Sequence, residues 1–253
     1  MQRYFGLEGK VALVTGASRG IGAAIATGLA ACGAQVVVSS RKLEGLAEVV
    51  TAITAAGGQA HAVTAHVGDA AALDHLVSET VRLTGGVDVL VNNAAANPVF
   101  GPLLATDDAV FDKIMAVNVR APLTLAKLVH PHMQARGGGS IINVSSIGGL
   151  RPEPMLGLYS VSKAALISLT KVQAQEWSRD GIRSNVICPG LVRTKFSAAL
   201  WQDEQLLGRF VQQVPLGRIA EPEEMAGLAI FLASPAASYV TGGVYTADGG
   251  YTA

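Results

Sequence analysis

Three polar side chains in the middle of the chain have the types and spacing needed for proton transfer to a carbonyl oxygen. Tyr159 and Lys163 are four residues apart and share one helix face, and Ser146 stands thirteen residues before Tyr159, at an expected strand end. A phenol with an ordinary pKa of about 10 is a poor catalyst at neutral pH, and a neighbouring ammonium lowers that pKa. We expect Lys163 to act in this way, and Ser146 to hydrogen-bond the substrate oxygen. The alternative is an ordinary surface pair.

A glycine-rich segment follows the first expected strand and opens the first long helix. Its sequence is Thr15-Gly16-Ala17-Ser18-Arg19-Gly20-Ile21-Gly22, with the spacing Gly-x₃-Gly-x-Gly. Gly16 permits a sharp turn, and Gly20 and Gly22 remove side chains where a pyrophosphate would approach backbone N–H groups at the helix N-terminus. The segment indicates dinucleotide binding, the alternative being a tight strand–helix connection without a ligand.

The end of the second expected strand indicates which dinucleotide binds. An Asp or Glu about 20 residues after the glycines usually bonds the adenosine ribose hydroxyls, whereas this chain has Ser39 and Ser40 there, followed by Arg41. No carboxylate repels a 2′-phosphate, and Arg41 can bind one bidentately, with Arg19 as a second contact. The pattern favours NADP(H) over NAD(H). In the alternative interpretation, Arg41 is a surface residue paired with a glutamate of the next helix.

Short β-branched segments alternate with longer segments rich in Ala and Leu. Such strands suit a parallel sheet covered on both faces, so we expect one α/β domain over residues 1–253 with a Rossmann-like, doubly wound parallel sheet. The expected strands are 11–14, 35–39, 59–64, 87–91, 140–144, 182–187 and 243–246, and the expected helices are 21–31, 43–56, 70–83, 107–119, 122–135, 159–178 and 221–232. A loop-rich insert at about 190–215 interrupts the alternation, and we interpret it as a substrate lid.

Together these motifs resemble the short-chain dehydrogenase/reductase superfamily along essentially the whole chain. Further matching residues are Asn92-Asn93-Ala94, Asn118, and Pro189-Gly190 with Thr194. The resemblance implies that Asn118 kinks a helix and holds a water that relays protons to Lys163, which also holds the nicotinamide ribose. It implies that residues 92–94 shape the adenine and ribose side of the cleft, and that the 189–194 loop contacts the nicotinamide carboxamide.

The motifs and the resemblance assign a role to each candidate residue. The catalytic residues are Asn118, Ser146, Tyr159 and Lys163. The cofactor-binding residues are Gly16, Ser18, Arg19, Gly20, Ile21, Gly22, Ser40, Arg41, His66, Val67, Asn92, Ala94, Tyr159, Lys163, Pro189, Gly190, Val192 and Thr194. The substrate contacts are Ser146, Asn97, Phe100, Gly148, Met155 and Trp201. The chain departs from the family pattern at His66, where Asp is common near the adenine, and at Ala95, where glycine is usual.

The composition excludes several classes of function. Half of the 253 residues are hydrophobic and 15% are charged, which is a buried-core composition, and 19 Lys+Arg balance 19 Asp+Glu. This balance gives no electrostatic footprint for nucleic acid or an acidic membrane. No apolar run of about 18 residues predicts a membrane span, and neither the cysteines, Cys32 and Cys188, nor the histidines show a metal-ligand spacing. We expect a cytoplasmic protein without a metal and, by the resemblance, a homotetramer or dimer.

The sequence thus predicts an oxidoreductase that transfers hydride between NADP(H) and a hydrophobic ketone or aldehyde, or the matching alcohol. Segments 97–101, 136–140, 189–197 and 200–203 look like the peroxisomal NADPH-dependent carbonyl reductase/retinol dehydrogenase branch, although the peroxisomal signal of that branch does not appear. A 3-oxoacyl-carrier-protein reductase is the alternative enzyme, with sparse support from Arg120 and Lys127. A non-catalytic cofactor-sensing protein is the alternative of another class, but a sensor has no need of the acid.

Overall fold

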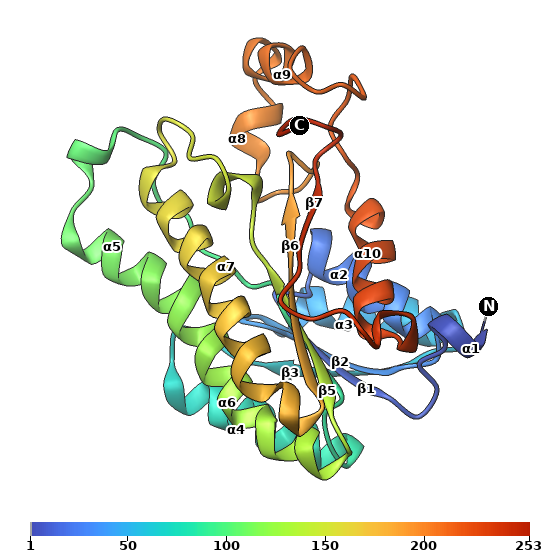
Figure 1. The fold of residues 1–253 in the computed structure, drawn as a ribbon. Coiled ribbons are helices and arrows are strands. Elements are labelled where there is room, and N and C mark those ends of the chain that lie inside the picture. Colours follow the sequence, from blue (N-terminus) through green and yellow to red (C-terminus); the bar gives the residue numbers. More distant parts are fainter. Residues whose placement is uncertain (1) are drawn as a thin grey trace.

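The central strands of this protein lack a polar face, and this property determines where they lie. All five residues of β1 (Val11–Thr15) and all four of β4 (Val89–Asn92) are buried. A strand of this kind must be covered on both sides, as in a parallel sheet between two layers of helices. The computed structural model, which describes residues 2–253, has this arrangement (Figure 1).

Seven strands pair in parallel in the order β3-β2-β1-β4-β5-β6-β7. The remaining strands are β2 (Gln35–Ser40), β3 (Gln59–Thr64), β5 (Gly139–Val144), β6 (Ile182–Pro189) and β7 (Val244–Ala247). All seven expected strands are confirmed. The strand order reverses between β1 and β4, and ligands of open α/β sheets bind in the crevice at the carboxyl ends of strands at such a point.

Helices cover both faces of the sheet, which confirms the doubly wound fold. The helices of ten residues or more are α2 (Gly20–Ala31), α3 (Leu43–Ala55), α4 (Ala70–Thr84), α6 (Ala121–Ala135) and α7 (Gly157–Trp177); the shorter ones are α1 (Gln2–Phe5), α5 (Asp108–Met115), α8 (Ala198–Trp201), α9 (Glu204–Val211) and α10 (Ala226–Ala233). One apolar core packs α2, α3 and α10 against the sheet, and a second packs α4 and α6 against the opposite face, where α7 also lies (Figure 1).

Two expected helices are divided. The helix predicted at 107–119 ends as α5 at Met115 and continues into α6 through a π-helical turn, η2 (Ala116–Arg120). The helix predicted at 221–232 begins with a 3₁₀ turn, η5 (Pro222–Met225). Four further 3₁₀ turns complete the description: η1 (Leu103–Ala105), η3 (Ile147–Gly149), η4 (Ser178–Asp180) and η6 (Pro235–Ala237).

The insert at 190–215 contains more regular structure than we expected. It carries α8 and α9, which lie beyond the carboxyl ends of the strands (Figure 1). Asp203 caps α9, because its Oδ1 accepts hydrogen bonds from the N–H groups of Gln205 and Leu206. Neither short helix has a buried residue, so these two helices stand at the carboxyl end of the sheet without being part of the core.

Both cysteines are free thiols, with Cys188 buried in β6 and Cys32 half-buried after α2. Burial raises the pKa of the Cys188 thiol to about 11. Within residues 2–253, no helix combines the length and the apolar character needed to cross a membrane. Over the same residues, no three His, Cys, Asp or Glu side chains gather closely enough to hold a metal ion.

Candidate active site

The three residues expected to move a proton lie together beyond the carboxyl end of β5. Ser146 follows β5 by two residues, and Tyr159 and Lys163 stand in the first two turns of α7. The Nζ atom of Lys163 lies 5.6 Å from the centroid of the Tyr159 ring, and the Ser146 hydroxyl is near enough to lower the pKa of the phenol. The Ser145 hydroxyl donates to the Lys163 carbonyl at 2.8 Å and thereby fastens the strand end to the helix.

Lys163 is buried, with 2% of its surface exposed. Its Nζ atom donates one hydrogen bond, to the Val144 carbonyl at 2.8 Å, and it forms no ion pair with any described carboxylate. Burial lowers the pKa of Lys163 to about 8 because desolvation disfavours the charged form. An ammonium has three N–H donors, so two remain to hold the hydroxyls of a ribose.

The pKa of Tyr159 differs from our expectation. We predicted that Lys163 lowers it, whereas burial raises the pKa of the Tyr159 phenol to about 12, against a smaller lowering by the Ser146 hydroxyl. Desolvation therefore determines the direction of the shift, although the Lys163 Nζ atom lies 5.6 Å from the centroid of the ring. At neutral pH the phenol keeps its proton, and this is the state required to protonate a carbonyl oxygen.

Asn118 lies in the π-helical turn η2 and joins two segments distant in sequence. Its Nδ2 group donates to the Ala96 carbonyl and to the Ser162 hydroxyl, both at 3.0 Å, and its Oδ1 atom accepts from the Ala96 N–H at 2.8 Å. Ser162 in turn donates to the Tyr159 carbonyl at 2.7 Å. Because both amide protons are used, the Asn118 side chain holds α7 in place. The water that the resemblance implies would then have to bind the backbone of the π turn.

The glycine-rich turn is bent by glycines and held by an asparagine. Gly16 and Gly20 have φ values of +64° and +57°, which residues other than glycine rarely adopt. The Nδ2 group of Asn93 donates to the carbonyls of Thr15 and Gly16 at 3.0 and 3.1 Å. A Cβ atom at Gly22 would stand 2.4 Å from the Gly16 carbonyl oxygen, so packing within the turn also requires this glycine.

The first turn of α2 fits an anion. The residue before the helix, Arg19, makes no side-chain cap hydrogen bond. Uncapped N–H groups at a helix N-terminus, together with the positive end of its dipole, form a ready site for phosphate groups. The turn therefore suits the pyrophosphate of a dinucleotide.

The end of β2 also fits the predicted cofactor. Arg19 and Arg41 are exposed, and neither makes an ion pair within residues 2–253, so the alternative pairing of Arg41 with Glu44 or Glu48 does not occur. The Ser39 hydroxyl is buried without a hydrogen-bond partner among the described residues. Two uncommitted guanidinium groups beside a carboxylate-free strand end are suited to a 2′-phosphate.

Two residues predicted on the adenosine side differ in their availability. The Asn92 side chain is buried and donates to Oδ1 of Asn143 on β5 at 2.9 Å, whereas its own Oδ1 atom has no hydrogen-bond partner among the described residues. The exposed His66 ring accepts the Gly68 N–H through Nδ1 at 3.1 Å. Its Nε2 atom is therefore the nitrogen that remains for the adenine.

The loop after β6 comes close to the glycine-rich turn. Val192 pairs with Ala220 in an isolated parallel bridge, which anchors the loop. The Cγ2 atom of Thr194 lies 3.1 Å from the position that a Cβ atom of Gly20 would occupy. Thr194 thus lies beside the glycine-rich turn, and its contact with the nicotinamide half of a cofactor stays a prediction.

Comparison with known proteins agrees with this geometry. A family model described as "Enoyl-(Acyl carrier protein) reductase" matches residues 16–252. "Dehydrogenase/reductase SDR family member 4" of Sus scrofa is 45% identical over 250 residues, which are 99% of this chain and 90% of that protein. The chain belongs to the short-chain dehydrogenase/reductase superfamily.

Solved structures of this superfamily superpose closely on the protein. A gluconate 5-dehydrogenase from Burkholderia cenocepacia J2315 in complex with NADP and tartrate is 35% identical, with a TM-score of 0.94 and coverage of 99% of this chain and 98% of that one. A 3-oxoacyl (acyl-carrier-protein) reductase from Agrobacterium tumefaciens C58 with NADP bound is 37% identical, with a TM-score of 0.93 and coverage of 99% and 97%. The protein is thus an oxidoreductase of the short-chain dehydrogenase/reductase type.

The predicted substrate contacts of this dehydrogenase/reductase fall into two groups. Met155, with a φ of +70°, accepts the Gly101 N–H at 3.0 Å and so brings the Phe100 loop against the loop before α7. Gly148 is buried and its N–H donates to the Ser146 hydroxyl at 3.1 Å, so this bond orients the Ser146 hydroxyl. Asn97 is half-buried in the loop after β4.

The insert contributes Phe196 and Trp201. The Phe196 ring is tilted toward Tyr159, with 6.0 Å between the ring centroids, although our substrate assignment did not include it. Trp201 instead donates its indole N–H to the Thr194 carbonyl at 2.9 Å. The rings of the insert thus face the catalytic residue in one case and the cofactor loop in the other.

Two residues hold the backbone of other site residues: Ser162, to which we assigned no role, and Asn93, which we expected only to help shape the adenine and ribose side of the cleft. Both make hydrogen bonds to backbone carbonyls of other site residues. A signal was present for Ser162, which is a polar residue on a helix face between apolar positions. The motif at 92–94 indicated Asn93, but its bonds to the glycine-rich turn depend on β4 lying beside β1.

Proposed function

We propose that this protein is an NADP(H)-dependent reductase of hydrophobic ketones and aldehydes that also oxidises the matching alcohols. The observation that carries the proposal is the juxtaposition of Ser146, Tyr159 and Lys163, with a protonated phenol, beside a phosphate-binding turn. Supporting the choice of NADP(H) are Arg19 and Arg41, which are exposed and have no described carboxylate partner.

The reaction follows from the positions of the side chains. A bound nicotinamide would supply or accept the hydride. Tyr159 donates its proton to the carbonyl oxygen, and Ser146, whose own hydroxyl is held by the Gly148 N–H at 3.1 Å, keeps that oxygen beside the phenol. Lys163 offers two free N–H donors to the ribose, and the π turn around Asn118 supports the proton supply to Lys163.

The substrate class is argued from the side chains at the mouth of the site, because the relatives act on different compounds. Eight of the fourteen exposed large hydrophobic side chains of the described residues lie on the connections that follow the carboxyl ends of β4, β5 and β6: Phe100, Leu103, Leu104, Leu150, Met155, Phe196, Leu206 and Leu216. Of these, the Phe196 ring lies beside Tyr159, with 6.0 Å between the ring centroids. Exposed apolar side chains gathered around a site mark a binding surface. An apolar carbonyl compound matches this rim better than a sugar acid does.

A 3-oxoacyl-carrier-protein reductase is the second candidate, favoured by the likeness to such an enzyme with NADP bound. Arg120 and Lys127 are both exposed and would face an acidic carrier domain. The two candidates share the same chemistry and differ only in the substrate. A cofactor-sensing protein without turnover is disfavoured by the complete proton-transfer set.

We further propose that the enzyme assembles as a homotetramer or dimer. Val161 and Val172 are exposed on α7, with 51% and 42% of their surfaces accessible in the single chain, and a second copy would cover them. Light scattering after size exclusion measures the assembly. A monomer at micromolar concentration contradicts this proposal.

One assay separates these candidates. Oxidation of NADPH and of NADH is followed by absorbance against an aryl ketone, a 1,2-diketone, retinal, a steroid ketone and an acetoacetyl thioester. We expect NADPH oxidation with the apolar carbonyls. Preference for the thioester supports the carrier-protein reductase, preference for NADH refutes the role of Arg41, and cofactor binding without turnover of any carbonyl supports the sensor.

A further inference from the structure

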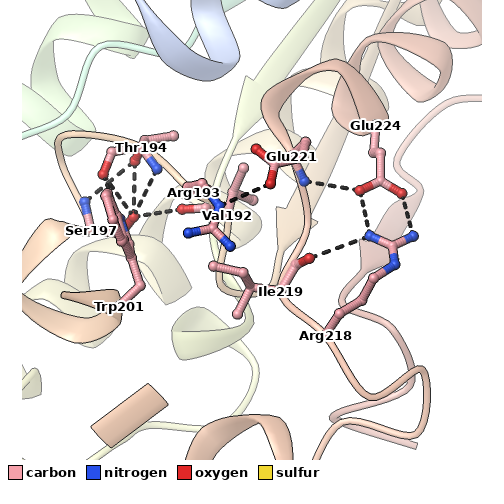
Figure 2. Close-up of polar contacts among 9 residues, drawn as sticks. All are labelled: Val192, Arg193, Thr194, Ser197, Trp201, Arg218, Ile219, Glu221 and Glu224. Atoms are coloured by element: carbon pink, nitrogen blue, oxygen red, sulfur yellow. Dashed lines mark hydrogen bonds and ion pairs between the residues drawn. The ribbon is translucent and has the colours of Figure 1, made fainter. Parts of the chain in front are cut away.

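The polar groups of Thr194 are held by the segment that follows it. The Trp201 indole N–H donates to the Thr194 carbonyl at 2.9 Å, and the Ser197 hydroxyl lies 3.0 Å from the Thr194 hydroxyl (Figure 2). Ser197 has one hydroxyl proton, and its shortest contact is to the Val192 carbonyl at 2.5 Å. Thr194 is therefore the donor to Ser197, and one lone pair of its hydroxyl oxygen remains for a ligand.

The guanidinium group of Arg193 lies over the Trp201 ring. Its Cζ atom lies 5.3 Å from the ring centroid, and its Nε group donates to Glu221 at 2.9 Å. Glu221 is itself fixed, because its N–H donates to Glu224 at 2.9 Å, and Arg218 binds Glu224 with two hydrogen bonds of 2.7 Å (Figure 2). A series of contacts between charged side chains thus connects η5, the turn before α10, to the indole.

These contacts lie at the surface, where single interactions are weak. The side chains of Arg193 and Glu221 are 45% and 51% exposed, and exposed ion pairs contribute little and weaken with salt. Two residues link α8 to the cofactor loop: Ser197 at its N-cap, and Trp201 at its end, whose ring packs under Arg193 and bonds Thr194. Small changes at this link would move Thr194 without disturbing Tyr159 or Lys163.

We propose that Trp201 is a positioning residue for the nicotinamide half of the cofactor and acts through Thr194, instead of contacting the substrate as we first assigned it. The indole N–H holds the Thr194 carbonyl, and this contact keeps the Thr194 side chain, with its Cγ2 methyl and Cβ atoms nearest, against Gly20 at the start of α2. Arg193 acts together with Trp201, since its guanidinium group lies over the indole ring and keeps the ring in its orientation. The inference rests on the proposed function, because it needs a nicotinamide dinucleotide in the cleft.

The first test compares Trp201→Phe with Trp177→Phe. The chain has two tryptophans, and Trp177, which packs on His130, is the matched control far from the cleft. Phenylalanine at 201 keeps a ring over Arg193 but loses the N–H donor. We expect the dissociation constant for NADPH, measured without substrate, to rise about five- to tenfold in Trp201→Phe and to change less than twofold in Trp177→Phe.

The kinetic pattern separates positioning from substrate contact. If Trp201 acts through the cofactor loop, kcat/KM falls by the same factor for a small 1,2-diketone and a large aryl ketone. A substrate contact gives an unchanged NADPH dissociation constant and losses that depend on substrate size, which would overturn the inference. A Thr194→Val change combined with Trp201→Phe should lose little beyond the larger single loss; additive losses would also refute the proposal.

Fluorescence supplies a readout besides activity. In Trp177→Phe, Trp201 is the remaining tryptophan, so its emission should change when NADP⁺ is added and saturate with the cofactor dissociation constant. Emission that stays constant while NADP⁺ binds, as measured by calorimetry, contradicts the link between Trp201 and the cofactor loop. Absence of NADP⁺ binding by calorimetry would instead contradict the proposed function.

Discussion

The floor of the active site and the insert above it are held by different kinds of interaction. Lys163 and Asn118 on the floor are 2% and 1% exposed, and both hydrogen-bond to groups of neighbouring segments: Lys163 to the Val144 carbonyl, and Asn118 to the Ala96 backbone and the Ser162 hydroxyl. In the insert, Phe196 is 56% exposed, and the Arg193–Glu221 ion pair is about half exposed. Buried bonds of the first kind maintain a fixed geometry, whereas exposed bonds of the second kind are individually weak.

This difference separates two tasks of the enzyme. Proton transfer requires atoms held within a few tenths of an ångström, and the buried floor provides that precision. Substrate entry and cofactor exchange require a segment that moves at low cost, and α8 and α9 have no buried residue to oppose such movement. We therefore expect changes on the floor to affect kcat, and changes in the insert to affect KM.

The largest effect is expected from Tyr159→Phe. The change removes the proton donor and keeps the ring, so kcat should fall by about 10²–10⁴-fold while NADPH binding is retained. Steady-state kinetics and fluorescence titration measure the two quantities. Tyr239→Phe is the control, since Tyr239 is fully exposed. Undiminished turnover in Tyr159→Phe would refute the mechanism.

Lys163→Met should lower activity and raise stability. The folded pKa of Lys163, about 8, lies below the value of about 10.4 in an unfolded chain. Below pH 8 Lys163 is charged in both the folded and the unfolded protein, and the folded protein carries the full cost of burying that charge. Between pH 8 and about 10.4 Lys163 keeps its proton only in the unfolded chain, so this cost is relieved as the pH rises.

At pH 7 the free energy of unfolding of the variant should therefore exceed that of the wild type by on the order of 1–3 kcal/mol, after the lost hydrogen bond to Val144 is subtracted. The difference should shrink as the pH rises from 8 to 10. Denaturant unfolding at several pH values measures it. A variant that is less stable than the wild type at pH 7 would show that Lys163 is stabilised in a way that its burial does not indicate.

Arg41→Ala tests the cofactor end of the site. Loss of a charge-assisted bond to the 2′-phosphate should raise KM for NADPH about ten- to a hundredfold and leave KM for NADH nearly unchanged. Lys171→Ala removes an exposed charge from the far part of α7 and serves as the control. An equal rise in KM for NADPH and for NADH would show that Arg41 is a surface residue without a role in cofactor choice.

The smallest effect is expected in the insert. Phe196→Ala removes a ring that is tilted toward Tyr159 at 6.0 Å, and it should raise KM for a large aryl ketone about three- to tenfold. KM for NADPH and kcat should stay within about twofold, since partly exposed ring contacts contribute little to the floor. A loss confined to kcat would mean that Phe196 positions Tyr159 instead of the substrate.

The seven strands and the main site motifs could be predicted from the sequence because each depends on short-range chemistry. Uninterrupted apolar segments such as 11–14 specify buried parallel strands. The spacing of four residues places Tyr159 and Lys163 on one helix face. The glycines at 16 and 20 correspond to positive φ values. In each case the information lies within a few residues of the feature.

Other features depended on residues far apart in the chain, and only the tertiary structure decided them. Asn118 binds Ala96, 22 residues away, and the Asn92 side chain turns to Asn143 instead of the cleft. Burial by several elements raised the pKa of Tyr159, where sequence reasoning predicted a lower value. The sequence determined which groups are present and the local backbone that carries them. Desolvation and hydrogen-bond partners decided how those groups behave, because both depend on packing between distant segments.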